Sequence, residues 1–407
     1  MDNNLSSKSL TSSQIFNILA LRYDTSQKSN LLKLNSSDFV PSSNQSSSEL
    51  IELLLKKSIK NKITSDTKAM NIALSGGVDS TLVLSIMKKY FSEIKINAFS
   101  VQFFDSIDET QQSQKIAEHF DVDYNKIFIE NYLQELPKAI SIVNAPFWDL
   151  HWYYVSKQAQ KSSSIILSGD GGDELFGGYT FRYEKYLNLT SSTSPPLDRV
   201  KNYLSCHERD FVPDQEKLFG EKLQFSWNDT YSSLLPYFDN SLSLLDQVFL
   251  ADYNGKLVYN FSLNNQKISN YFNLESITPI LEPDLISYAT HLSHKYKYDP
   301  KLNIGKLPLR KLLDKFNVTS LISNQKLGFS VNTINLWKNY GYEICKDFLL
   351  DAEISKEGWI NSDWINLHLS KELNNIKYIN KFLGLLALEI WYRLFVTKEM
   401  NSNSKLI

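Results

Sequence analysis

Cysteine is almost absent from this 407-residue sequence, which contains only Cys206 and Cys345. Two distant cysteines cannot build a disulfide scaffold, and there is no C-x-x-C pair for zinc or redox chemistry. This usage favours a reducing, cytoplasmic setting. Cys206 stands beside His207, but the polar, Asp-rich surroundings favour a neutral thiol over a nucleophile.

An excess of charge of one sign is also lacking, because 43 Lys and Arg residues balance 45 Asp and Glu residues. The composition therefore predicts binding neither to nucleic acid nor to a membrane surface. The longest apolar run, residues 382–396, is too short to span a bilayer. It carries Glu389 and Arg393 at i, i+4 spacing and is expected to form a buried C-terminal helix. The polar start, MDNNLSSKSLTSS, is unlike a secretory signal.

Residues 1–48 are rich in Ser and Asn, which predicts an extension or linker with one ordered patch at IFNILALRY. Residues 49–407 are expected to form the functional domain, with an α/β core at about 68–190 and a helical part at about 191–407. In the core, apolar strand patterns alternate with amphipathic helix patterns, which is typical of a doubly wound parallel sheet. The strands are expected at residues 69–74, 97–103, 124–129 and 164–167.

Two glycine-rich segments follow the first and fourth predicted strands: LSGGVDSTLV at residues 74–83 and SGDGGDELFGGY at residues 168–179. In a doubly wound sheet of order 3-2-1-4-5 these strands are neighbours, and ligands bind at their carboxyl ends, where the winding reverses. We therefore expect the two segments to face each other across one crevice. A helix is expected at residues 80–91, with Asp79 or Ser80 as its cap.

Asp79 is an unexpected residue for a loop that binds phosphate. Backbone N–H groups of residues 75–80 could wrap phosphate oxygens at the helix N-terminus. Asp79 and Asp173 could then hold Mg²⁺, which prefers carboxylate and phosphate oxygens. The pattern G-x-x-x-x-G-K-[ST] is absent. A loop that grips the β- and γ-phosphates would leave the α-phosphate open to attack, with release of pyrophosphate and formation of an adenylate.

These two segments resemble the synthetase domain of the asparagine synthetase family, a member of the ATP-pyrophosphatase group (PP-loop, HUP-like) with the signature S-G-G-x-D-S. Weaker similarity extends from about residue 50 to the end, through NLESITPILEPDLISYA, GKLPLRKLL, NQKLGFS and LLALEIWYRLF. The resemblance implies a ligase that uses ATP and Mg²⁺ to adenylate a side-chain carboxylate. The expected acceptor is aspartate, and ammonia would convert its adenylate to asparagine and AMP.

The resemblance also implies roles for individual residues. Leu74 and Val101 would contact the nucleotide through their backbones, Asp170 would serve acyl-adenylate formation, and Lys326 would steady the adenylate and the tetrahedral intermediate. The remaining nucleotide and metal contacts would come from Ser75, Gly76, Gly77, Asp79, Ser80, Ser168, Gly169 and Asp173.

Several other residues are open to two interpretations. Lys306 and Arg310, at helical spacing, could contact pyrophosphate or form a solvated basic face. Glu275 could orient the acceptor or take part in acid–base chemistry, or it could form a structural ion pair. His291 and His294 share a helix face but have no third zinc ligand nearby in the sequence.

The sequence departs from the family pattern near the acceptor motifs. The arginine of L-E-x-R is Ile277, the F-L-D segment is residues 280–282, and the arginine before the family's lysine is Asn324. These departures concern the acceptor acid more than the ATP chemistry. Full-length members also begin with a glutaminase domain that carries an N-terminal cysteine, and this chain has none before Cys206. We therefore expect free ammonia or a separate glutaminase subunit as the nitrogen source.

Three alternatives stay open at this point. The first is an amide- or lactam-forming synthetase that acts on another acid in secondary metabolism. The second is a PP-loop tRNA-modifying enzyme, although the neutral charge, the lack of C-x-x-C and the second motif count against it. The third is a non-catalytic regulatory partner, against which the intact Asp79, Asp173 and Lys326 count.

Overall fold

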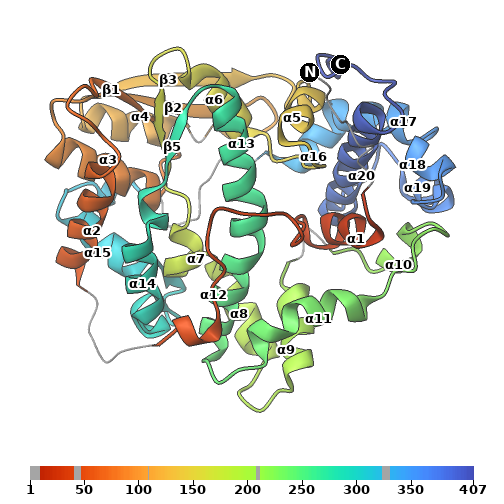
Figure 1. Cartoon of the computed structure of the whole chain (residues 1–407), viewed down its shortest axis with the longest axis horizontal. Coiled ribbons are helices and arrows are strands. Elements are labelled where there is room, and N and C mark those ends of the chain that lie inside the picture. Colours follow the sequence, from red (N-terminus) through yellow and green to blue (C-terminus); the bar gives the residue numbers. More distant parts are fainter. Residues whose placement is uncertain (1–9, 41–46, 109, 208–210, 323–330) are drawn as a thin grey trace, which may run out of the picture.

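A five-stranded parallel sheet forms the centre of the α/β part of the computed structural model (Figure 1). The structure describes residues 10–40, 47–108, 110–207, 211–322 and 331–407. The strand order is β3-β2-β1-β4-β5, with every pair parallel, and it confirms the predicted doubly wound α/β class. The strands are β1 (Ala69–Ala73), β2 (Lys95–Phe103), β3 (Asp123–Ile129), β4 (Ile165–Leu167) and β5 (Glu275–Ile277).

Helices cover both faces of this sheet. Those of the α/β part are α2 (Ser48–Lys60), α3 (Val78–Tyr90), α4 (Thr110–His119), α5 (Leu136–Val143) and α6 (His151–Ala159). Successive strand residues point to opposite faces. Ile72 of β1 accordingly packs in one core with α2, α3 and α4, while Ala73 packs in a second core with α5 and α6.

Helix α3 begins two residues earlier than the sequence predicted. Its N-cap is Gly77, whose carbonyl accepts the first helical hydrogen bond, from the Thr81 N–H. The predicted caps, Asp79 and Ser80, were therefore wrong. The Ser80 hydroxyl instead accepts a hydrogen bond from the Ser75 N–H at 3.2 Å, and Asp79 lies in the first helical turn.

The rest of the chain after β4 is mainly helical, as predicted. Besides β5, it contains a small antiparallel pair, β6 (Tyr298–Asp299) and β7 (Ile304–Gly305). The larger helical elements are α7 (Gly172–Phe176), α8 (Thr180–Leu189), α9 (Pro196–Ser205), α10 (Gln215–Leu218), α11 (Trp227–Phe238), α12 (Leu244–Asp252), the π-helix η2 (Tyr253–Ser262), α13 (Leu263–Tyr271), α14 (Pro283–His291), α15 (Leu307–Asp314), α16 (Thr333–Leu336), the π-helix η6 (Trp337–Gly341), α17 (Tyr342–Leu349), α18 (Glu353–Lys356), α19 (Ser362–His368) and α20 (Ile376–Phe395).

The N-terminal segment contains a packed helix, α1 (Ser12–Leu21), which matches the patch of order expected within residues 15–23. Ile15, Phe16, Ile18 and Leu19 of α1 are buried in the same core as α5 and α20. The Lys381 ammonium on α20 donates to the Leu19 carbonyl at the C-terminal end of α1. Figure 1 shows α1 lying against α20. Part of the predicted linker is thus integrated into the folded domain.

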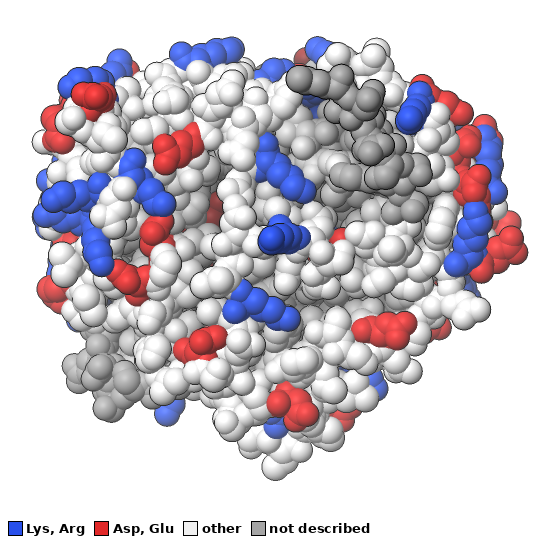
Figure 2. All heavy atoms as spheres, in the orientation of Figure 1, with Lys and Arg blue, Asp and Glu red and all other residues white. Residues whose placement is uncertain are grey.

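Helix α20 confirms the buried C-terminal helix. Glu389 is fully buried, and its carboxylate accepts hydrogen bonds from the Glu353 and Ile354 N–H groups at the start of α18, both at 3.0 Å. Arg393 Nε donates to the same carboxylate at 2.5 Å. Among the described residues, no helix is long and apolar enough to cross a membrane. Figure 2 shows that acidic and basic side chains are both spread over the visible face.

Candidate active site

The loop between β1 and α3 is folded around its own serines. Ser75 Oγ lies 3.2 Å from Ser80 Oγ and accepts from the Gly77 N–H at 3.3 Å. The Thr81 hydroxyl donates to the Gly77 carbonyl at 2.7 Å. At the entry to the loop, the Leu74 N–H donates to Phe99 O at 2.9 Å. These bonds fix the N-terminus of α3 at the carboxyl end of β1, where backbone N–H groups of the first helical turn can receive an anion.

The second glycine-rich loop follows β4 and lies directly against the first. A Cβ atom added at Gly169 would lie 2.6 Å from the Ser80 backbone nitrogen, and one added at Gly172 would overlap the Asp79 carboxylate. No side chain larger than hydrogen fits at either position. The two loops therefore meet, as expected for loops that follow neighbouring strands.

Lys306 joins the two loops electrostatically. Its ammonium contacts the Asp79 carboxylate and lies 2.8 Å from Asp173 Oδ1. Burial alone would lower the pKa of Lys306, but the charges of Asp173 and Asp79 outweigh burial and raise it. Lys306 is the N-cap of α15, with φ of 58°, and Arg310 lies one helical turn further along. Asp79 also acts electrostatically on Arg310.

The position of Lys306 tests whether Asp79 and Asp173 suit a metal. Because one ammonium contacts both carboxylates, their oxygens lie close enough to share a single cation. Both are hard oxygen ligands of the kind Mg²⁺ prefers. Within the described ranges, no group of three or more His, Cys, Asp and Glu side chains is arranged for a metal. Two carboxylates suit Mg²⁺, which commonly takes its other ligands from phosphates and water.

Asp170 precedes Asp173 by three residues in the same loop, and the charge of Asp173 acts on it. Its Oδ2 accepts hydrogen bonds from Ser168 Oγ and from Asn265 Nδ2, both at 3.1 Å. Burial raises the pKa of Asp170, while the nearby His151 acts in the opposite direction. For His151, which is charged when protonated, burial has the opposite effect and lowers the pKa. Burial thus disfavours charge on both groups, so Asp170 holds a proton up to a higher pH than an exposed aspartate does.

Not every predicted residue joins this cluster. Glu275 is the exposed first residue of β5, paired with Ile165 at the start of β4, and the structure does not bring its side chain to the carboxyl ends of the strands. Val101 is buried near the carboxyl end of β2. Lys326 lies outside the described residues. His294 contacts Ser243 and Asp246, at 2.9 and 3.2 Å, rather than sharing a site with His291.

Three polar residues beside Asp170 were missed by sequence reasoning. Thr278 follows β5 and lies 3.4 Å from the Ser168 hydroxyl, Asn265 comes from α13, and His151 begins α6. Strand β5 has the sequence ESI, in which two of three residues are polar, so it gave no recognisable apolar strand pattern. With β5 unrecognised, Thr278 could not be placed at the edge where ligands bind.

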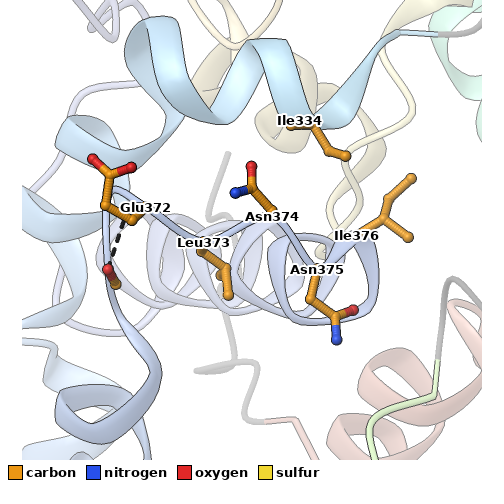
Figure 3. Close-up of a pocket in the computed structure, with 7 residues that line it drawn as sticks. Ile334, Glu372, Leu373, Asn374, Asn375 and Ile376 are labelled. Carbon is orange, nitrogen blue, oxygen red and sulfur yellow. Dashed lines mark hydrogen bonds between the residues drawn. The ribbon is translucent and has the colours of Figure 1, made fainter.

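A separate surface groove lies between α16 and the start of α20 (Figure 3). Ile334 lines one side, and residues 370 and 372–376 line the other. The Glu372 N–H donates to Ser370 Oγ at 3.3 Å within this lining. The groove contains a single titratable side chain and none of the predicted site residues, so it offers no comparable chemistry.

Comparisons with known proteins agree with the motifs. The sequence profile described as asparagine synthase matches residues 50–393. A relative from Bacillus subtilis (strain 168), named asparagine synthetase [glutamine-hydrolyzing] 1, is 25% identical over 80% of this chain and 56% of its own length. A putative asparagine synthetase [glutamine-hydrolyzing] 2 from Methanocaldococcus jannaschii is 34% identical over 33% of this chain and 27% of its own length.

The chain thus spans about half the length of the Bacillus relative. Among solved structures, the U34-tRNA thiolase NcsA from Methanococcus maripaludis is similar, with a TM-score of 0.26 and 15% identity. The match covers 60% of this chain and 76% of the thiolase. NMN synthetase from Francisella tularensis matches with a TM-score of 0.25 and 16% identity, over 56% of this chain and 91% of the synthetase.

Proposed function

Because this chain belongs to the asparagine synthase family, whose members are ATP-dependent amide-forming ligases, we propose that it adenylates the side-chain carboxylate of an amino acid, with aspartate as the first candidate. Ammonia then converts the acyl-adenylate to an amide. The observation that carries this proposal is the convergence of Asp79 and Asp173 on Lys306, between two glycine loops at the carboxyl ends of β1 and β4.

Different residues of the proposed site would bind different parts of ATP. The N-terminus of α3 and the Lys306 ammonium would hold the β- and γ-phosphates, so that they leave together as pyrophosphate. Bound Mg²⁺, held by Asp79 and Asp173, would neutralise charge on the triphosphate. The adenosine part would lie along the strand ends at Leu74 and Val101, where their backbone groups can contact the base.

The reaction balances in two steps. A carboxylate oxygen of the acceptor attacks the α-phosphorus, a bond forms between them, and the bond to the pyrophosphate breaks. Ammonia then attacks the acyl carbon, AMP leaves with the former carboxylate oxygen, and the nitrogen loses one proton. We assign that proton to Asp170, because its buried carboxylate has a raised pKa and accepts a proton at higher pH than an exposed aspartate does. Lys326 is proposed to stabilise the charge that develops on the oxyanion.

The burial of the two cysteines supports a proposal for the nitrogen source. Both Cys206 and Cys345 are buried, and burial raises the pKa of the Cys345 thiol. Neither offers the accessible thiolate that glutamine hydrolysis needs. We therefore propose free ammonia, or a separate glutaminase subunit, as the donor.

Acceptor-dependent exchange of labelled pyrophosphate into ATP tests the proposal. The purified chain is incubated with ATP, Mg²⁺ and each of a panel of amino acids and other carboxylic acids, without ammonia. We expect exchange with at least one acid that carries a second carboxylate. A complete absence of exchange over the panel, from a folded protein that binds ATP, would contradict adenylation.

A further inference from the structure

A second group of charged side chains lies beside Asp170. Arg22 is the C-cap of α1, Asp149 and His151 flank the N-cap of α6, and Lys256 lies on η2. These three segments are distant in sequence, and all three lie outside both glycine loops. The charges of Arg22, Lys256 and His151 all act on Asp149.

Direct contacts connect this group to Asp170. Asn265 Nδ2 donates to Asp170 Oδ2 at 3.1 Å, and the Asn265 carbonyl accepts from the Trp152 indole at 3.1 Å. Trp152 follows His151 in α6, and the charge of Asp170 acts on His151. The start of α6, with Asp149 and His151, is therefore held next to the carboxylate that we assign to the chemical step.

Helix η2 contacts the N-terminal segment at the Arg22 backbone and at the Tyr23 side chain. The Arg22 residue has a φ of 67°, which is unusual for a residue other than glycine, and its carbonyl accepts from Asn260 Nδ2 at 2.8 Å. A Cβ atom added at Gly255 would lie 2.9 Å from the Tyr23 hydroxyl. Figure 1 shows the segment after α1 running beside α12 and α13. The N-terminal segment thus brings Arg22 to the same region as Lys256.

The guanidinium of Arg22 is fixed by its neighbours. It lies 4.6 Å from the centre of the Trp148 ring, and its Nη2 donates to Asp149 Oδ1 at 2.6 Å. The Asp149 side chain is 25% exposed and the Arg22 side chain 10% exposed, so both side chains keep some contact with solvent. Burial alone would raise the pKa of Asp149, but the charges of Arg22, Lys256 and His151 lower it to about 2. At neutral pH the group therefore presents an ionised carboxylate beside a permanent cation.

We propose that Arg22 and Asp149 form the subsite for the head group of the acceptor, which is an α-amino dicarboxylic acid. The acceptor's α-carboxylate binds the guanidinium, whose five N–H donors suit bidentate pairing, and its α-ammonium binds Asp149. The side-chain carboxylate then extends past Asn265 to Asp170 and the α-phosphate. This inference rests on the proposed function, and it assigns selection of the acceptor to the N-terminal segment.

The charges explain why an amino acid fits better than a simple dicarboxylic acid. An ionised Asp149 repels an acid that carries no positive group, and it attracts an ammonium. Removing the α-carboxylate from the acceptor would leave Arg22 without its second anionic partner. The subsite therefore selects for acceptors that carry both an α-ammonium and an α-carboxylate.

Pyrophosphate exchange with matched acids tests the subsite. L-aspartate is compared with succinate, which lacks the ammonium, and with 3-aminopropanoate, which lacks the α-carboxylate; L-glutamate is compared with glutarate and 4-aminobutanoate. For the wild type we expect at least tenfold higher kcat/KM for one of the two amino dicarboxylic acids than for either of its analogues. Arg22→Met should raise the KM for that acid at least tenfold and leave the KM for ATP within twofold. Asp149→Asn should reduce the preference over the deamino analogue.

Two further variants and a folding check make the result decisive. Arg22→Lys keeps the positive charge but lacks the planar guanidinium that pairs with a carboxylate through two hydrogen bonds. Its KM for the acid should lie between those of the wild type and Arg22→Met. Arg199→Met is the matched control, because Arg199 donates to the Ser194 carbonyl on another part of the surface, and its acid KM should not change. The thermal midpoint of each variant is measured in parallel.

The outcomes separate the two claims. Two outcomes overturn the subsite and leave adenylation intact. One is equal wild-type kcat/KM for an amino dicarboxylic acid and for its analogues that lack the α-ammonium or the α-carboxylate. The other is an unchanged KM for the acid in a folded Arg22→Met. If Arg22→Met does not fold, Arg22→Lys and Asp149→Asn decide by the same measure. No exchange by the wild type with any acid overturns the proposed function and the subsite together.

Discussion

Asp79, Asp173 and Lys306 form the smallest unit on which the proposed chemistry depends. Two carboxylates and one ammonium meet at the contact of the glycine loops, and their side chains are only 12–21% exposed. Replacing either aspartate by asparagine removes one of two anionic ligands from a cation site. We expect Asp79→Asn and Asp173→Asn each to lower Mg²⁺-dependent pyrophosphate exchange by about 10²-fold or more.

The matched control is Asp66→Asn, because Asp66 is exposed in a turn before β1. It should exchange pyrophosphate at the wild-type rate. Steady-state rates over a Mg²⁺ titration, with circular dichroism to verify folding, measure the effect. Near-normal turnover in either site variant at every Mg²⁺ concentration would refute a shared cation.

Asp170 makes a prediction about pH. Burial raises the pKa of Asp170. As pH falls, its carboxylate therefore becomes protonated, and can no longer accept a proton, at a higher pH than an exposed aspartate would. The rate of amide formation should therefore fall as pH decreases through that raised pKa. Asp170→Asn should lower the rate about 10²- to 10⁴-fold and abolish this acidic limb. The measurement is kcat/KM for ammonia against pH, with concentrations calculated as free NH₃.

The presence or absence of this acidic limb in Asp170→Asn shows whether Asp170 accepts the proton. A limb that persists unchanged in Asp170→Asn would assign the proton transfer to another group. Pyrophosphate exchange, which requires no loss of a proton from ammonia, serves as the internal control and should lack this limb in the wild type.

At the scale of elements, helix α1 makes the N-terminal segment part of the folded domain. Leu19 is 2% exposed in the core shared with α20, whereas Leu32, further along the same segment, is 79% exposed. Leu19→Ala should lower the free energy of unfolding by about 2–5 kcal/mol. Leu32→Ala, as the control, should change it by about 0.5 kcal/mol or less. Urea titrations at equal m-values give both numbers. Equal, small effects would show that α1 adds nothing to the stability of the domain.

Elements with a clear apolar pattern were predictable, including the three-residue β4, and elements without one were not. Strands β1 to β4 and their order follow from alternating apolar and amphipathic patterns, and α20 follows from its continuous apolar run. Strand β5 has three residues, and its pairing with β4 is a tertiary effect that local sequence does not encode. The start of α3 was misplaced because Ser80 lies within the helix, where its hydroxyl accepts from the Ser75 N–H instead of capping the helix.

The candidate site was predictable to the extent that it depends on topology. Once β1 and β4 are neighbours, their two loops must meet, and Asp79 and Asp173 come with them. Lys306 had two readings in sequence, because its approach to both carboxylates depends on a left-handed backbone at the start of α15. Glu275 looked equally promising, but the register of β5 places it at the opposite, amino-terminal end of the strand. Asn265 and Arg22 reach the region only through the packing of η2 and α13, which no local motif reports.

At the scale of the whole molecule, the chain lacks an accessible thiol in its described residues, since Cys206 and Cys345 are both buried. We expect amide formation with ammonium as donor, and none with glutamine when this chain is the sole protein present. Labelled glutamine, with and without an added glutaminase, distinguishes the two sources. Labelled amide, or steady release of glutamate, from this chain alone would contradict the expectation.

The central claim is that a carboxylate attacks the α-phosphorus of ATP, and transfer of ¹⁸O tests it most directly. The acceptor that supports pyrophosphate exchange is labelled with ¹⁸O in its side-chain carboxylate and converted fully to amide with ATP, Mg²⁺ and ammonia. Mass spectrometry of the nucleotide products then follows the label. We predict one ¹⁸O atom in AMP for each amide formed, with unlabelled pyrophosphate. Label in inorganic phosphate, together with ADP, would contradict adenylation and identify an acyl phosphate instead.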